Sequence, residues 1–282
     1  MQNNQQNFDF YTFSQNSLEK IYSVFSKKFL ECRNELSEGS IHDARVTTRR
    51  FRALLTLMIR YYNSVYAREL RKELKVILEL LNPLRDIQVQ IITVRNMAVK
   101  QPVLSGFLEY LLDLEIEYSA KISKEIQKLD IGSIEGLVFF LKMDLKNKYR
   151  MKSIDLSEFK KFIADSFADV VSKRENAIPS QLKTIHDLRL SFKKYRYTCE
   201  FFKTILDIDE TKFKRMKGYQ NILGSIQDNN VLLSLLQSFM KTLKNQKNTE
   251  YIPIVTKIIN KRTKLVFNLM TKHDYLTVLE VV

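Results

Sequence analysis

The stretch IHDARVTTRRFR, residues 41–52, decides the fold, because a close copy of it, IHDLRLSFKKYR, occupies residues 185–196. Each copy places a histidine and several basic side chains within about three helical turns. Both copies begin with Ile-His-Asp and keep an arginine three residues after the histidine, and they lie 144 residues apart. Like charges at this density repel one another on a helix, so the repetition indicates a shared requirement.

A second pair of segments indicates that the whole chain is repeated. LLNPLRDIQV (80–89) aligns with ILGSIQDNNV (222–231) at a shift of 142 residues. The identical pairs are Leu81 and Leu223, Asp86 and Asp228, and Val89 and Val231. Two matches in the same order predict an internal duplication, in which each half is an antiparallel bundle of about four helices. We expect the halves to be related by pseudo-twofold symmetry.

Helical periodicity dominates the chain, and glycine and proline are scarce (6 and 4 residues). Apolar residues recur at helical spacing, and few segments alternate as strands do. The fold is therefore predicted to be all-α, a single domain over 8–282 with halves 8–150 and 151–282. The expected helices cover about 16–36, 41–63, 66–99, 103–129, 134–150, 155–177, 181–207, 210–244 and 250–272.

The basic residues of each copy share one helical face. Spacing of i, i+3, i+7 and i+10 confines side chains to an arc of roughly 80°. The first basic row is His42, Arg45, Arg49 and Arg52, and the second basic row is His186, Arg189, Lys193 and Arg196. Apolar residues project from the opposite side and predict the core-facing stripe. They are Ala44, Phe51, Leu54, Leu55 and Met58 in the first copy, and Leu188, Tyr195, Cys199 and Phe202 in the second.

The chain is strongly basic, with 46 Lys and Arg against 32 Asp and Glu, a net charge of +14 and a pI near 9.6. This sign favours a polyanion or an anionic surface as partner. Four aspartates could neutralise part of the rows, namely Asp43, Asp86, Asp187 and Asp228, but the cations outnumber them. Lys72, Lys75, Lys214 and Lys217 add to the excess. If the halves face each other, both rows line one central basic groove, which concentrates the potential.

Each histidine follows a residue suited to capping a helix. Ser40 and Thr184 are the expected N-caps, with an aspartate three residues later. His42 and His186 then fall in the first helical turn, where the helix dipole favours neutral imidazole. Free N–H groups near arginines also suit a phosphate group. Each histidine therefore has two open roles, a ligand contact or a structural hydrogen bond.

Several classes of function are disfavoured by what the sequence lacks. Apolar runs stay far below the roughly 18 residues of a membrane span, so no membrane partner is expected. Cys32 and Cys199 are too few and too distant for a disulfide framework or a metal cluster, which favours a reducing cytoplasm. We find no glycine-rich phosphate loop, nucleophile motif or magnesium-binding acidic cluster. A non-enzyme without a cofactor is expected.

These residues resemble the CHAD family, the conserved histidine α-helical domain. HDARVTTRRFR and HDLRLSFKKYR both fit the family pattern H-D/E-x-R-x-x-x-R/K-R/K-x-R, and LRD and LGSIQD resemble its second motif. Tyr197 follows the second copy, as is common in the family, whereas Ala53 stands in the first. Pro83 replaces a glycine that is usual in the second motif. The resemblance spans about residues 15 to 275.

The resemblance implies two helical bundles whose basic groove binds inorganic polyphosphate without turning it over, with targeting to polyphosphate granules. The binding residues it implies are His42, Arg45, Arg49, Arg50, Arg52, Lys72, Lys75, His186, Arg189, Lys193, Lys194, Arg196, Tyr197, Lys214 and Lys217.

Other functions are weighed against this one. Nucleic-acid (RNA) binding is the main alternative, but the chain has no Trp and most aromatic residues fall on core stripes. A phosphoacceptor histidine lacks an accompanying nucleotide motif. A metal site at His42 and His186 is disfavoured because arginines crowd both residues. A protein–protein scaffold stays open.

Overall fold

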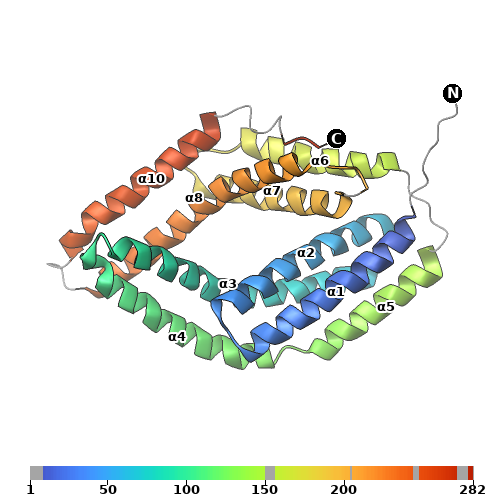
Figure 1. The fold of residues 1–282 in the computed structure, drawn as a ribbon, viewed down its shortest axis with the longest axis horizontal. Coiled ribbons are helices and arrows are strands. Elements are labelled where there is room, and N and C mark those ends of the chain that lie inside the picture. Colours follow the sequence, from blue (N-terminus) through green and yellow to red (C-terminus); the bar gives the residue numbers. More distant parts are fainter. Residues whose placement is uncertain (1–8, 150–155, 204, 244–247, 272–278, 282) are drawn as a thin grey trace. The chain divides into compact units, whose positions relative to one another are not determined.

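A computed structural model describes residues 9–149, 156–203, 205–243, 248–271 and 279–281, and this part of the chain contains helices and no strand (Figure 1). The α-helices are α1 (Phe10–Asn34), α2 (Glu38–Tyr62), α3 (Val65–Ala98), α4 (Ser105–Gln127), α5 (Ile131–Tyr149), α6 (Leu156–Glu175), α7 (Leu182–Phe202), α8 (Glu210–Thr242) and α10 (Ile252–Thr271). Two short 3-10 helices are η1 (Pro102–Leu104) and η2 (Thr249–Tyr251). The prediction of an all-α fold is confirmed.

The predicted helices agree with the observed ones to within a few residues at most ends. The largest differences among the described ends are at the start of α1, expected at 16 and observed at Phe10, and at the end of α7, expected at 207 and observed at Phe202. The ends expected at 150, 155, 244 and 272 lie outside the described residues. Pro102 and Pro253 stand at the starts of η1 and α10, where a missing N–H costs nothing, but Pro83 lies inside α3.

The chain divides into two compact units. Unit 1 comprises Met1–Arg85 and Glu117–Phe162, and unit 2 comprises Asp86–Ile116 and Ile163–Val282. Helices α3, α4 and α6 therefore each contribute one part to unit 1 and another part to unit 2. This division differs from the expected halves 8–150 and 151–282, and the boundary expected at 150/151 lies outside the described residues. The internal duplication and its symmetry stay predictions.

In unit 1, α1 packs along α2 and against α5 (Figure 1). An aromatic cluster joins the start of α1 to the end of α2 and to α6. The ring of Phe10 lies 5.2 Å from that of Tyr62 and 4.8 Å from that of Phe159, between centroids. The Tyr62 hydroxyl donates a hydrogen bond to the Phe10 carbonyl at 3.2 Å. The apolar stripe predicted for the first copy is fully buried in this core.

In unit 2, α8 packs against both α7 and α10. Phe192 and Tyr219 meet with ring centroids 4.7 Å apart, and the stripe predicted for the second copy is buried. The buried Arg174 of α6 donates to the carbonyls of Leu269 and Met270, both at 2.6 Å. These are carbonyls of the last turn of α10, which lack helical partners, so Arg174 caps that helix from outside.

Candidate anion-binding site

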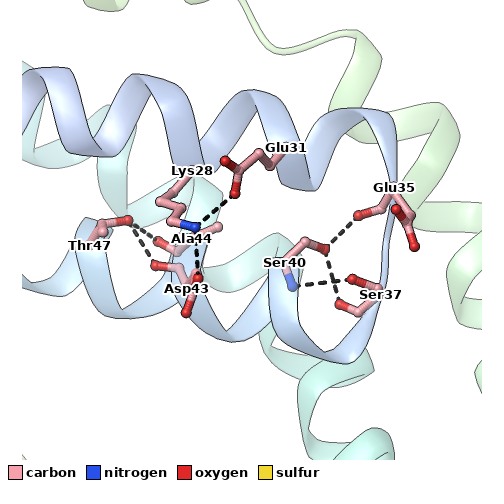
Figure 2. A network of polar contacts seen from close by, with 8 residues as sticks. All are labelled: Lys28, Glu31, Glu35, Ser37, Ser40, Asp43, Ala44 and Thr47. Carbon is pink, nitrogen blue, oxygen red and sulfur yellow. Dashed lines mark hydrogen bonds and ion pairs between the residues drawn. The ribbon is translucent and has the colours of Figure 1, made fainter.

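Helix α2 begins one turn earlier than expected. Ser37 is the N-cap, and its hydroxyl oxygen accepts from the backbone N–H of Ser40 at 3.2 Å (Figure 2). The Ser40 hydroxyl instead donates to the carbonyls of Glu35 and Ser37, at 2.5 and 3.0 Å. The prediction that Ser40 caps the helix is therefore wrong. Ser37 is the better cap because Glu38 then enters the first turn, where an acidic side chain is favoured.

The cap predicted for the second copy is also wrong. Gln181 precedes α7, and no side chain accepts a capping hydrogen bond there. The Thr184 hydroxyl accepts from the N–H of Ile178 at 2.9 Å and donates to the Gln181 carbonyl at 2.8 Å. It therefore ties α7 to the turn before it.

Both histidines occupy the fifth position of their helices rather than the first turn. The predicted effect of the helix dipole on them is therefore weaker, because that effect fades within the first turn. Burial and the nearby Arg85 guanidinium nevertheless lower the pKa of His42. A neutral imidazole is thus favoured at His42 for a different reason from the one expected.

The first basic row lies along α3 within unit 1. Arg45 is buried, and its Nη1 donates to Oδ1 of Asn82. The charge of Arg85 acts on His42, and the charge of Arg71 acts on Arg52. The α3 positions on this side share an arc of roughly 80°. This facing row consists of Arg71, Lys75, Leu78, Asn82 and Arg85.

Three arginines meet toward the C-terminal half of the first basic row. Arg52 is half-buried, and its Nε is buried with no hydrogen-bond partner among the described residues. Burial, and then the charges of Arg71 and Arg49, lower the pKa of Arg52, whereas Glu79 opposes that change. In the described part of the chain neither Arg49 nor Arg52 forms an ion pair. Their positive charge is therefore available to an anion.

The remaining predicted cations of unit 1 are exposed. Lys72 pairs with Glu69 at 2.8 Å, and Lys75 pairs with Glu79 at 3.2 Å. Exposed pairs of this kind are worth at most about 1 kcal/mol, so either lysine can exchange its carboxylate for another anion. Arg50 is exposed on α2, beside the first basic row.

The second basic row lies along α8 within unit 2. Nδ1 of His186 lies 3.0 Å from Oε1 of Gln227, which is a structural hydrogen bond of the kind left open for the histidines. Arg196 donates from Nη1 to Gln220 at 3.0 Å and from Nη2 to Glu200 at 2.6 Å. Arg196 thus uses two of its five N–H donors inside the protein, while its buried Nε has no hydrogen-bond partner among the described residues.

The other predicted residues of unit 2 differ in exposure. Arg189 and Lys193 are half-buried on the row. Lys194, Lys214 and Lys217 are exposed. Tyr197 is buried, and the Arg196 guanidinium carbon lies 5.8 Å from the centre of its ring. Tyr197 therefore supports the arginine rather than offering an open aromatic surface.

Sequence reasoning missed the residues that face both rows. Arg71, Asn82 and Arg85 were readable as one face of α3, because their spacing with Lys75 and Leu78 alternates four and three residues. Glu200 was readable too, since it stands four residues after Arg196. The expected role of Asp43 is only partly observed. Asp43 pairs with Lys28 of α1 at 3.0 Å (Figure 2), and within the row its charge acts on His42.

Two kinds of feature are absent from the described residues: a metal-binding cluster and a membrane-spanning helix. No group of three or more His, Cys, Asp and Glu side chains lies close enough there to hold a metal ion. No helix there is both long enough and apolar enough to cross a membrane. The central groove shared by both halves stays a prediction, because each row is described only within its own unit.

Comparison with known proteins agrees with this fold. The profile of the CHAD domain matches residues 25–237, which is well over half of the chain. A solved structure, the CHAD domain from the plant Ricinus communis, is similar with a TM-score of 0.68 and 16% sequence identity, over 97% of this chain and 91% of that one. No curated protein matches the chain. The chain belongs to the CHAD domain family.

Proposed function

We propose that this chain binds inorganic polyphosphate without turning it over, using the two basic rows, and that this binding directs it to polyphosphate granules in the cytoplasm. The observation that carries the proposal is the cluster of Arg49, Arg52 and Arg71. These guanidinium groups approach one another without a carboxylate ion-pair partner for Arg49 or Arg52 in the described part of the chain. Because like charges this close repel one another, a bound anion would stabilise the cluster.

Phosphate is the anion that suits these side chains best. A guanidinium group presents parallel N–H donors that match two oxygens of one phosphate. The cations recur along one face of α2 at intervals of about 5 Å, which is the rise of one helical turn. A repeating polyanion can therefore contact several of them in succession, whereas a single small anion contacts only one or two.

Nucleic acid is the competing ligand, because it shares the phosphate charge. Proteins that hold single strands add exposed aromatic rings on which bases stack. The aromatic side chain next to the second basic row, Tyr197, is buried. Tyr197 thus offers no open stacking surface beside the second basic row, which favours a bare phosphate chain over RNA.

A competition experiment tests the proposal. A fluorescent long-chain polyphosphate is bound to the protein and displaced by unlabelled polyphosphate, single-stranded RNA or duplex DNA at matched phosphate concentration and two salt concentrations. Polyphosphate should displace the probe at far lower concentration than either nucleic acid at both salts. If RNA displaced the probe equally well, the site would be assigned to nucleic-acid binding instead. Polyphosphate of unchanged length after long incubation supports a non-catalytic role, and shortened chains would contradict it.

A further inference from the structure

We infer that the two basic rows are unequal, and that Glu200 acts as a built-in competitor for the anion at Arg196. The inference rests on the proposed function, because it concerns how strongly each row takes a polyphosphate chain. It concerns a carboxylate that lies outside the predicted site residues, and the contacts of Arg196 carry it.

The pair formed by Glu200 and Arg196 occupies the atoms that a phosphate would use. Nη2 of Arg196 donates to Oε1 of Glu200 at 2.6 Å, and Nη1 donates to Gln220 at 3.0 Å. Only 17% of the Arg196 side chain and 22% of the Glu200 side chain are exposed. A charge-assisted hydrogen bond that is shielded from solvent in this way is stronger than an exposed ion pair. A phosphate therefore competes with this carboxylate for Arg196.

Arg52, the equivalent of Arg196 in the first basic row, forms no ion pair among the described residues, and Glu79, whose charge acts on Arg52, pairs with Lys75 at 3.2 Å. The sequence shifts of 144 and 142 residues place Thr56 opposite Glu200, and Leu78 opposite Gln220. The Thr56 hydroxyl donates to the carbonyl of Arg52 at 2.9 Å, so it is turned to the backbone. Neither Thr56 nor Leu78 carries a carboxylate for Arg52.

The residue at position 71 adds a second difference between the two units. Its equivalent in unit 2 is Phe213, whose ring lies 5.4 Å from Nζ of Lys203. Unit 1 therefore adds an arginine to its row where unit 2 has an aromatic ring. Unit 1 presents the open row, and unit 2 presents a row that is partly closed by its own carboxylate.

Removing the competitor should tighten binding. Glu200→Gln keeps the size of the side chain and removes its charge, so the affinity for long-chain polyphosphate should rise roughly three- to tenfold, as expected for loss of one competing charge-assisted bond. Glu175→Gln is the matched control, because Glu175 is an exposed residue of α6 and its change alters the net charge equally. The control should change affinity by less than about twofold, as a screened distant charge does.

The reciprocal variant adds a competing carboxylate to the first basic row. Thr56→Glu places a carboxylate four residues after Arg52, as Glu200 stands after Arg196, and should weaken polyphosphate binding by a similar factor. Helicity and thermal melting are measured for every variant. An affinity for Glu200→Gln equal to that of the control, or lower than wild type because Glu200 holds Arg196 in position, would overturn the inference. Absence of polyphosphate binding by the wild-type protein would instead overturn the proposed function.

Discussion

The two basic rows share one sequence motif, yet the residues that surround them differ. In unit 1, the row meets further cations on α3, and Arg52 keeps a buried Nε without a hydrogen-bond partner among the described residues. In unit 2, the row meets amides on α8. Arg196 donates to Gln220 and Glu200, although its Nε is also buried without a hydrogen-bond partner among the described residues. The two rows therefore differ in their ion pairs, because Arg52 forms none among the described residues, whereas Arg196 pairs with Glu200.

Charge reversal should show the largest difference between the rows. The double variant Arg49→Glu with Arg52→Glu removes two charge-assisted contacts and should weaken polyphosphate binding by about a hundredfold or more. Lys193→Glu with Arg196→Glu should weaken it less, by roughly tenfold, because Arg196 is already engaged by Glu200. Fluorescence anisotropy with labelled polyphosphate measures both.

A matched double reversal controls for net charge. Lys124 and Lys128 are exposed and lie outside both rows, so Lys124→Glu with Lys128→Glu changes the charge equally. It should weaken binding only slightly, and helicity measured by circular dichroism should stay unchanged in all three proteins. Equal losses from rows and control would mean that diffuse charge holds the ligand.

The stability of the free protein should respond with opposite sign in the two units. Arg196→Met should lower the free energy of unfolding by about 1–3 kcal/mol, because it removes the ion pair between the half-buried side chains of Arg196 and Glu200. Arg52→Met should leave stability unchanged or raise it by up to about 1 kcal/mol, because it removes an unpaired cation beside Arg71. Urea unfolding without phosphate in the buffer measures both. Similar destabilisation by the two variants would contradict the difference between the rows.

The fold was largely predictable because the apolar stripes and the basic rows obey one helical period. The caps were not, since Ser37 and Ser40 are equally good capping residues and only the preceding backbone decides between them. The neighbours of the rows could be read only in part. Arg71 and Arg85 lie on one face of α3, but which helix faces α2 depends on tertiary packing. The burial of Arg45 against Asn82 follows from that packing and has no local signal.

Arg71 should prove to be a binding residue of unit 1, although the motif does not contain it. Arg71→Ala should weaken polyphosphate binding roughly fivefold, by loss of one exposed phosphate contact. Arg60→Ala is the control, because Arg60 is an exposed arginine in the last turn of α2. The slope of affinity against salt should fall for Arg71→Ala and stay constant for Arg60→Ala. Equal effects of both substitutions would exclude Arg71 from the site.

The smallest expected effect is the titration of His42. Its pKa is lowered from 6.5 by burial and by Arg85, so the folded protein takes up this proton less readily than the unfolded chain. The stabilising contribution of neutral His42 is therefore complete above pH 6.5 and declines as the pH falls below that value.

Bound polyphosphate should raise the pKa of His42, because negative charge beside the first basic row favours imidazolium. The proton NMR signal of its ring, assigned by its loss in His42→Gln, should titrate below pH 6.5 in the free protein and at higher pH in the complex. Since Arg85 lowers this pKa, Arg85→Gln should raise the midpoint even without ligand. A titration midpoint that changes neither with polyphosphate nor with Arg85→Gln would mean that the charges of the row do not act on His42. The binding site would then consist of the arginines without His42.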